Sequence, residues 1–280
     1  LPPFVKGGNK VLVAQFAPAI RVSIGEEFSA PYGKIMTGQV VAALKKLGFN
    51  YVFDVNFGAD ITTMVEAREL LARLKTGIPP DKGGQRGVLP MFTSCCPAWV
   101  KYIEFYRPDL IPNLTTARGP QTHSAGLIKT YWAETMKINP KNITVVSIMP
   151  CTAKKFEASR AELKVNGFLP VDYVITTREL ALMIKRNKID FLKLKCEPAD
   201  NPLGAASGAA AIYGASGGVM ESTLRTAEYL MAGKKFTKIR TAVVNGIGKI
   251  EEVLKNLRDY DYVEVMACPD GCSGGGGQPI

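Results

Sequence analysis

Short runs of apolar and β-branched residues alternate along the chain with longer segments whose apolar residues recur every three or four positions. The short runs predict strands at 10–18, 51–55, 88–93, 143–149, 173–176, 239–245 and 262–266. The longer segments predict helices at 34–47, 61–75, 120–136, 177–187, 218–231 and 249–257. Strands that alternate with helices are typical of an α/β protein with mainly parallel sheets.

One interruption in this pattern suggests how the chain is divided. The segment KINPKN at 137–142 separates two periodic stretches and contains residues that favour turns. We therefore expect a single domain over 1–280 with two lobes, about 1–137 and about 138–280. Each lobe is predicted to be a mainly parallel twisted sheet flanked by helices. With 46% hydrophobic residues, the chain can bury a sizeable core.

The charge of the chain narrows the choice of partners. A net charge of +10 attracts acidic proteins or nucleic acid. The basic residues are scattered as pairs, such as Lys45-Lys46, with no basic arm, no aromatic and basic stacking motif and no finger spacing. An acidic protein is therefore favoured over nucleic acid. No run of about 18 apolar residues is present, so we expect no membrane span.

Five of the six cysteines follow predicted strands. Cys95 and Cys96 lie in TSCCPAW, Cys151 lies in MPCTAKKFE, and Cys268 and Cys272 lie in EVMACPDGCSGGGGQP. In open α/β sheets, ligands bind at the carboxyl ends of the strands. Thiolates select iron-sulfur clusters or zinc over hard cations. The spacing therefore indicates a soft-metal site to which three distant segments contribute.

Other interpretations of these cysteines stay open on spacing alone. Disulfides belong mainly to small secreted domains, and this chain has no signal-like N-terminus. A structural zinc site usually has two short Cys-x-x-Cys pairs, whereas here only Cys268 and Cys272 form a local pair. A noncatalytic zinc-binding module and small buried thiols at strand ends are the remaining alternatives.

The three cysteine segments resemble, in order and in spacing, the three signature motifs of the iron-only hydrogenases. Four further segments are also similar to that family: FAPAIRVSIGEEF, FGADITTMVEA, DYVITTREL and SGAAAIYGASGGVME. The resemblance implies a hydrogenase that catalyses reversible reduction of protons to dihydrogen. It also implies an H-cluster in the crevice between the lobes. This cofactor is a 4Fe-4S cubane joined to a two-iron unit with carbon monoxide, cyanide and azadithiolate ligands.

The resemblance also implies roles for the cysteines. By motif position, the ligands of the cubane are Cys96, Cys151, Cys268 and Cys272. Cys272 is expected to bridge the cubane and the two-iron unit. Cys95 is left outside the ligand set, as the thiol that exchanges protons with the bridging amine.

Further residues match family positions around the cluster and along a proton route. Lys154 is expected to contact a cyanide, and the residues expected to line the same pocket are Ala17, Pro18, Gln121, Met149 and Met266. The proton relay is expected to use Glu157 and Glu66, with Thr115 in place of a serine and Arg73 near its outer end. Without the resemblance, Glu66 would be interpreted as an exposed charge on its helix.

The glycine-rich segments GASGGVMES and SGGGGQP lack the spacing of phosphate-binding or dinucleotide-binding loops. They predict a close approach of the backbone to a bulky cluster.

The expected partners follow from what the sequence contains. No cysteine-rich, ferredoxin-like module precedes the domain, so the chain is interpreted as a minimal form that takes electrons from a ferredoxin or similar acidic carrier. Hydrogenase maturation proteins are the other expected partners, and a cytoplasmic or other reducing, anaerobic compartment is the expected location. The alternative is a noncatalytic iron-sulfur assembly scaffold or a hydrogen sensor. Assembly-type relatives are expected to lack Cys95 and Lys154.

Overall fold

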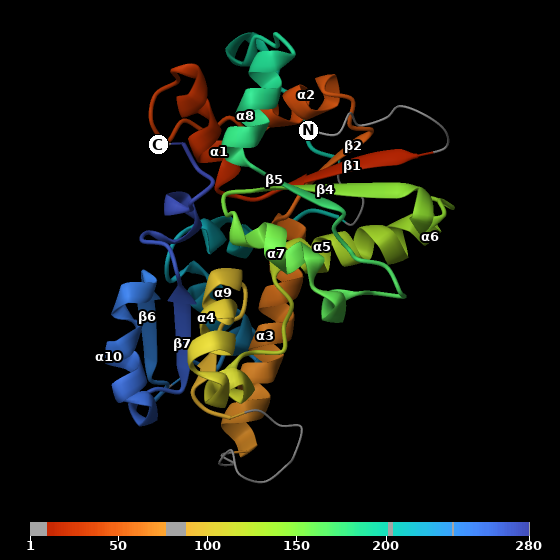
Figure 1. Cartoon of the computed structure of the whole chain (residues 1–280). Helices are drawn as coiled ribbons and strands as arrows, with labels where there is room; N and C mark the ends of the chain where they lie inside the picture. The colour runs from red at the N-terminus through yellow and green to blue at the C-terminus, as the bar shows by residue number, and fades with distance from the viewer. Residues whose placement is uncertain (1–9, 77–87, 201–203, 237, 280) are drawn as a thin grey trace. The chain divides into compact units, whose positions relative to one another are not determined.

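The computed structural model describes residues 10–76, 88–200, 204–236 and 238–279 (Figure 1). The chain forms two compact units, each assembled from separated segments. Unit 1 comprises Leu1–Val55, Ser124–Ala205 and Gly277–Ile280, and unit 2 comprises Asn56–His123 and Ala206–Gly276. The lobe boundary predicted near 137–142 instead falls inside unit 1. The reason is that Trp132 and Ile143, on either side of it, pack in one core.

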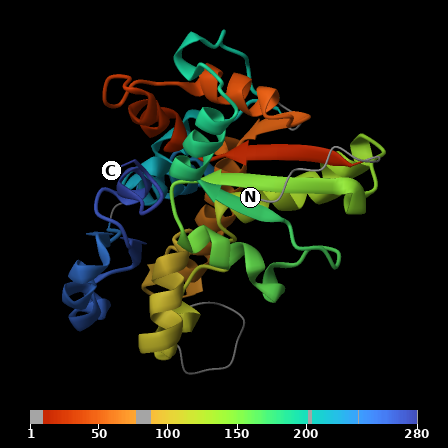
Figure 2. The ribbon, with the colours of Figure 1, turned by 45° about the horizontal axis from the view of Figure 1, so that its top comes forward.

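Unit 1 is built on a parallel sheet of four strands in the order β2-β1-β4-β5. The strands are β1 (Val11–Phe16), β2 (Tyr51–Asp54), β4 (Ile143–Met149) and β5 (Tyr173–Thr176). Figure 2 shows the two long strands, β1 in red and β4 in light green, side by side at the centre of this sheet. Parallel neighbours end at the same edge, so the segments after β1 and β4 are brought together.

Helices cover both faces of this sheet. The helices are α1 (Ile20–Ser23), α2 (Thr37–Lys46), α5 (Pro120–Leu127), α6 (Ala133–Thr135), α7 (Ala153–Ser159) and α8 (Thr177–Arg186). Ala14 and Phe16 of β1 pack with α2 and α8, whereas Val13 packs with the segment of α5 and α6. Alternate side chains of one strand thus enter different cores, as a doubly covered sheet requires. A capping box of Thr176 and Glu179 begins α8.

Unit 2 is built on a parallel sheet of three strands in the order β3-β7-β6. Its strands are β3 (Met91–Phe92), β6 (Thr241–Asn245) and β7 (Tyr262–Met266). Its helices are α3 (Asn56–Thr76), α4 (Pro97–Tyr106), α9 (Gly218–Leu230) and α10 (Ile250–Lys255). Val263 and Val265 pack with α4 and α10, whereas Tyr262 packs with α3 and α9.

The pairings confirm the predicted fold class, because all five pairings between the described strands are parallel. None of the helices within the described residues has the length and apolar character needed to cross a membrane.

Candidate functional site

In unit 1, the carboxyl ends of β1 and β4 bring several predicted site residues to one edge. The N–H of Ala17 donates to the carbonyl of Ile148 at 3.0 Å, which fastens the turn at Ala17 and Pro18 to the end of β4. Met149 ends β4, and Cys151 follows two residues later. Met149 is buried and Cys151 is half-buried. The sheet therefore places one thiol beside three of the residues predicted to line a pocket.

Lys154 and Glu157 form a buried ion pair on α7. The Lys154 ammonium donates to both carboxylate oxygens of Glu157, at 3.1 and 2.9 Å. Both residues are less than a tenth exposed. Three positions along a helix put two side chains on the same face, so the spacing allows this pairing. Glu157, predicted as a proton-relay carboxylate, thus holds the ammonium three residues after Cys151.

In unit 2, β3 and β7 bring cysteines to the corresponding edge. Cys95 and Cys96 follow β3, and Cys268 follows β7. Burial raises the pKa of Cys268, and the neighbouring Cys96 raises it further, so these two thiols interact electrostatically. Cys95 and Cys96 both pack against the cluster that contains Met266. Adjacent parallel strands therefore collect three thiols in one unit.

The fourth cysteine of unit 2 lies in a glycine-rich turn. Cys272 is in the 3-10 turn Gly271–Gly274. Gly271 has a φ of +72°, and a Cβ there would lie 2.7 Å from the backbone nitrogen of Ser216. A side chain at Gly271 would therefore press against backbone of the same unit.

The donor set fits a thiolate-bound cluster by its chemistry. All six cysteines lie in the described part of the chain, where no disulfide joins any of them. Those of the three motifs are half-buried, four of them just after strands and Cys272 in the 3-10 turn, and Cys196 is exposed. No group of three His, Cys, Asp or Glu side chains forms a metal site within the described residues. The fit therefore rests on thiol chemistry and strand-end position, with Cys151 in unit 1 and Cys96, Cys268 and Cys272 in unit 2.

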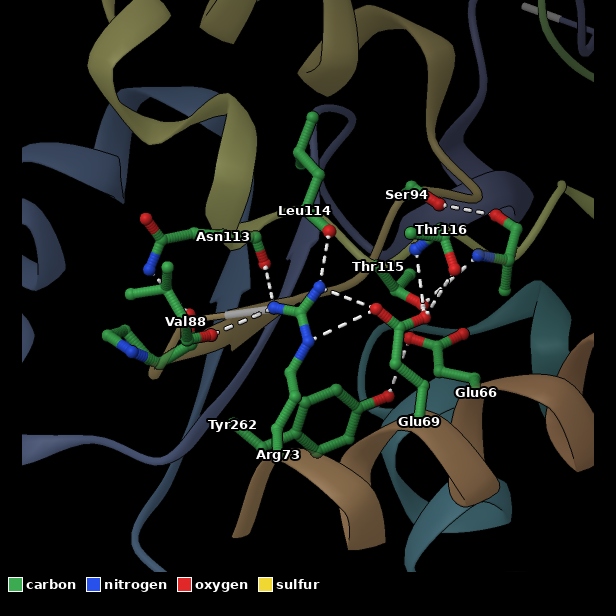
Figure 3. A network of polar contacts seen from close by, with 12 residues as sticks. Glu66, Glu69, Arg73, Val88, Ser94, Asn113, Leu114, Thr115, Thr116 and Tyr262 are labelled. Carbon is green, nitrogen blue, oxygen red and sulfur yellow. Dashed lines mark hydrogen bonds and ion pairs between the residues drawn. The ribbon is translucent and has the colours of Figure 1, made fainter. Parts of the chain in front are cut away.

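A buried carboxyl, Glu66, lies on α3 of unit 2. Its side chain is fully buried, and the hydroxyl of Tyr262 donates to its Oε1 at 2.9 Å (Figure 3). Burial raises the pKa of Glu66 to about 8, and the hydrogen bond from Tyr262 opposes that rise. A carboxyl with this pKa can hold a proton at neutral pH and also release it.

A second carboxylate, Glu69, lies one helical turn from Glu66. Its Oε2 accepts from the hydroxyl of Thr115 at 2.7 Å and from the N–H and hydroxyl of Thr116, both at 2.9 Å. Its Oε1 accepts from the guanidinium of Arg73 (Figure 3). The structure thus joins two predicted relay residues, Thr115 and Arg73, through a carboxylate that the sequence analysis did not select.

Spacing contains the signal that could have revealed Glu69. Glu66, Glu69 and Arg73 are separated by three and four residues, which places all three on one face of α3. Spacing along the helix contains no signal for Tyr262, because its contact with Glu66 joins positions 196 apart.

The remaining pocket residues are placed as follows. Met266 is 2% exposed and ends β7, next to the cysteine edge. Gln121 is buried near the start of α5. Tyr213, which is not one of the predicted pocket residues, is buried, and its hydroxyl bonds to that of Thr63 on α3 at 2.7 Å.

Arg73 is expected to contribute strongly to stability. Its guanidinium is buried and donates to the carbonyls of Val88, Asn113 and Leu114 as well as to Glu69. Replacing Arg73 with Met keeps a long apolar stem but leaves a carboxylate and three carbonyls without this donor. We expect the free energy of unfolding to fall by about 3 kcal/mol or more.

Urea unfolding measures this loss, and Arg68→Met is the matched control, because Arg68 is an exposed residue of the same helix. Equal stability of the two variants would contradict a structural role for the guanidinium.

Fold and site together define a class: an α/β protein that presents cysteines at the carboxyl edges of parallel sheets. The family described as "Iron only hydrogenase large subunit, C-terminal domain" matches residues 10–276. The chain belongs to this family.

Individual relatives agree with this assignment. The NADP-reducing hydrogenase subunit HndD of Solidesulfovibrio fructosivorans is 43% identical over 97% of this chain and 50% of its own length. Iron hydrogenase 1 of Clostridium pasteurianum is 42% identical over the same shares. The chain thus spans about half the length of these relatives. A solved structure from a study of FeFe-hydrogenase oxygen inactivation superposes with a TM-score of 0.86 at 34% identity, over 98% of this chain and 82% of the other.

More distant relatives carry a different name. The cytosolic iron-sulfur assembly component 3 of Bos taurus is 29% identical over 96% of this chain and 62% of its own length.

Proposed function

We propose that this domain is the catalytic H-cluster domain of a hydrogenase that interconverts protons and electrons with dihydrogen. The observation that carries the proposal is the placement of the three cysteine motifs at the carboxyl edges of parallel sheets, in a chain of the iron-only hydrogenase family. Cys96, Cys151, Cys268 and Cys272 would hold the cubane, with Cys272 also joined to the two-iron unit. When bound, the H-cluster supplies electrons and the iron site at which dihydrogen forms or splits.

The protein's own part in this reaction is to deliver and remove protons. Cys95 packs in the apolar group with Met266, and it would exchange a proton with the cofactor. The carboxyl of Glu66 would exchange protons with Cys95, because its pKa, raised to about 8, suits a group that both binds and releases a proton near neutral pH.

The outer part of the proton route would use Glu69. Its contacts with Thr115 and Arg73 support this assignment in place of Glu157. Glu157 would instead hold the Lys154 ammonium, leaving Lys154 to meet a cyanide of the cofactor. Ala17, Pro18, Gln121, Met149 and Met266 would line the cofactor pocket.

The electron donor would be a ferredoxin or a similar acidic carrier, because the chain has a net charge of +10. Attraction between opposite charges speeds encounter and is screened by salt. We therefore expect the rate with ferredoxin as the donor to fall about tenfold or more between 0.01 M and 0.5 M salt. The rate with methyl viologen, a cation, should not fall. A parallel fall with both donors would contradict charge steering.

Maturation proteins that supply the two-iron unit are the second class of partner proposed. A reducing compartment is proposed as the location, although one relative, 41% identical over 99% of this chain, carries the name of a periplasmic hydrogenase large subunit.

The second candidate function is a noncatalytic iron-sulfur scaffold, which the assembly-type relatives favour. A proton-exchanging thiol and a lysine facing a cyanide have no use in such a scaffold. Cys95 and the buried Lys154 therefore favour the enzyme.

Infrared spectroscopy of anaerobically matured protein separates the two functions. The hydrogenase requires carbon monoxide and cyanide stretches together with hydrogen evolution from reduced viologen. Iron-sulfur absorption without these bands, even after a synthetic two-iron unit is supplied, would support the scaffold.

A further inference from the structure

The ring of Tyr262 lies in an apolar contact, and its hydroxyl bonds to a buried carboxyl. It is fully buried, and its ring packs with Leu70 of α3 and Met91 of β3. Its hydroxyl donates to Oε1 of Glu66 at 2.9 Å (Figure 3). A phenylalanine would fill the same apolar volume without donating this bond. The hydroxyl is therefore present for its partner rather than for packing.

The Glu66 carboxyl is held on one side only. Within the described residues, its Oε2 has no hydrogen-bond partner. Tyr262 is thus the donor that orients this carboxyl, and it acts on one of the two oxygens. An oriented carboxyl with one unengaged oxygen is suited to take a proton at a defined atom.

The neighbouring charged and titratable groups do not replace this donor. On α3, Glu69 raises the pKa of Glu66 and Arg73 lowers it, but the described hydrogen bonds of Arg73 go to Glu69 and to backbone carbonyls. Glu264 of β7 also raises the pKa of Glu66, while its own oxygens accept from the N–H groups of Gly217 and Met220. These groups change the charge around Glu66 without fixing its orientation.

Tyr213 is the other phenol near this carboxyl, and its hydroxyl bonds to that of Thr63. Among the described residues, it too makes no hydrogen bond to Glu66.

We propose that Tyr262 is a positioning residue, whose hydroxyl fixes the Glu66 carboxyl through Oε1 and leaves Oε2 as the atom that takes up and releases the proton. This inference rests on the proposed function, in which Glu66 exchanges protons with Cys95. When Cys95 passes a proton to Glu66, its S–H bond breaks as an O–H bond forms at Oε2, and in the reverse direction that O–H bond breaks as the S–H bond forms. No electron is transferred at Glu66. Tyr262 keeps its own proton throughout, since burial raises the pKa of this phenol well above its usual range.

The test is infrared spectroscopy of the carboxyl C=O stretch in the full chain, with and without the cluster, during a pH titration. The band is assigned by its loss in Glu66→Gln. In Tyr262→Phe we expect the band to move to higher wavenumber, because Oε1 loses its donor. We also expect its titration midpoint to rise by about one pH unit, because that donor favours the ionised form.

Tyr213→Phe is the matched control, because it removes another buried phenol hydroxyl that bonds to Thr63 and not to Glu66. Its band and midpoint should equal those of the unmodified chain. If the carboxyl band of Tyr262→Phe likewise keeps the position and the titration midpoint of the unmodified chain, the positioning role is overturned.

Turnover measurements distinguish a failure of the proposed function from a failure of the positioning role of Tyr262. In the matured enzyme, Tyr262→Phe should shift the pH profile of turnover in the direction of the infrared midpoint. If Glu66→Gln turns over at the normal rate, the proton route through Glu66 is wrong, and the proposal for Tyr262 falls with it. If Glu66→Gln is slow but Tyr262→Phe keeps both its pH profile and its band, only the positioning role is refuted.

Discussion

Replacing Cys95 with serine is expected to lower hydrogen evolution by about 10²- to 10⁴-fold while iron content and cofactor bands stay unchanged. Cys95 is proposed as the proton-exchanging thiol and lies outside the proposed ligand set. A thiol ordinarily has a pKa near 8.5 and loses its proton readily, whereas an alcohol does not. Serine keeps the size of the side chain, so the packing against Met266 should survive. The expected loss of hydrogen evolution is therefore a loss of proton transfer.

The measurements are iron content, infrared bands and viologen-driven hydrogen evolution on the same anaerobic sample. Cys196→Ser is the matched control, because Cys196 is an exposed thiol outside the three motifs. It should keep full turnover. Two results would count against the role of Cys95: normal turnover in Cys95→Ser, or loss of the cluster in that variant.

The sequence predicted the sheets well because buried parallel strands have a strong apolar signature. The predicted bounds of β4, β5 and β7 agree with the structure at both ends. β3 is shorter than predicted, at two residues, and follows Pro90, which has no N–H to contribute to a ladder. The local apolar pattern thus located the strands, and the backbone chemistry of single residues such as Pro90 set where a strand begins.

Two helices that follow the motif cysteines escaped prediction. α4 begins directly after Cys96 with Pro97, and no side chain of the usual capping types marks its start. α7 spans seven residues, too short for a periodic pattern to stand out. α4 begins one residue after Cys96, and α7 begins two residues after Cys151. We attribute both helix starts to the packing of the turn that holds the cysteine rather than to a helix-start signal in the sequence.

In the candidate site, too, some residues could be predicted from the local sequence, whereas others depend on contacts between distant segments. The cysteines and Lys154 could be selected from contiguous motifs. The choice of Glu69 over Glu157 depends on contacts with Thr115 and Thr116, which are more than 40 residues away. A charged residue on a helix is ordinarily exposed, so pattern alone could not predict the burial of Glu66. That burial comes from long-range contacts, among them the one with Tyr262 of β7.

Glu66→Gln is expected to remove a pH dependence of stability along with proton transfer. The folded pKa of Glu66, about 8, lies above its ordinary value of 4.5. The folded chain therefore binds this proton more tightly than the unfolded chain. The stabilisation is fully present below pH 4.5 and is lost as the pH rises through 8. Between pH 6 and pH 8 we expect the unmodified chain to lose roughly 2 to 3 kcal/mol relative to Glu66→Gln, at up to about 1.4 kcal/mol per pH unit.

Urea unfolding of the full chain at several pH values tests this slope, and Glu134→Gln controls for the loss of one exposed carboxylate. Burial lowers the folded pKa of His123 from 6.5 to about 4, so this histidine adds a slope of opposite sign below about pH 7. The unmodified chain and Glu66→Gln share this contribution, so it cancels in the difference between them. In the matured enzyme, Glu66→Gln should also lower turnover by about 10²-fold or more, since an amide cannot relay the proton. A slope shared by Glu66→Gln and the unmodified chain would mean that Glu66 is ionised in the folded protein. It could then not act as the neutral, proton-holding carboxyl that the buried contact with Tyr262 implies.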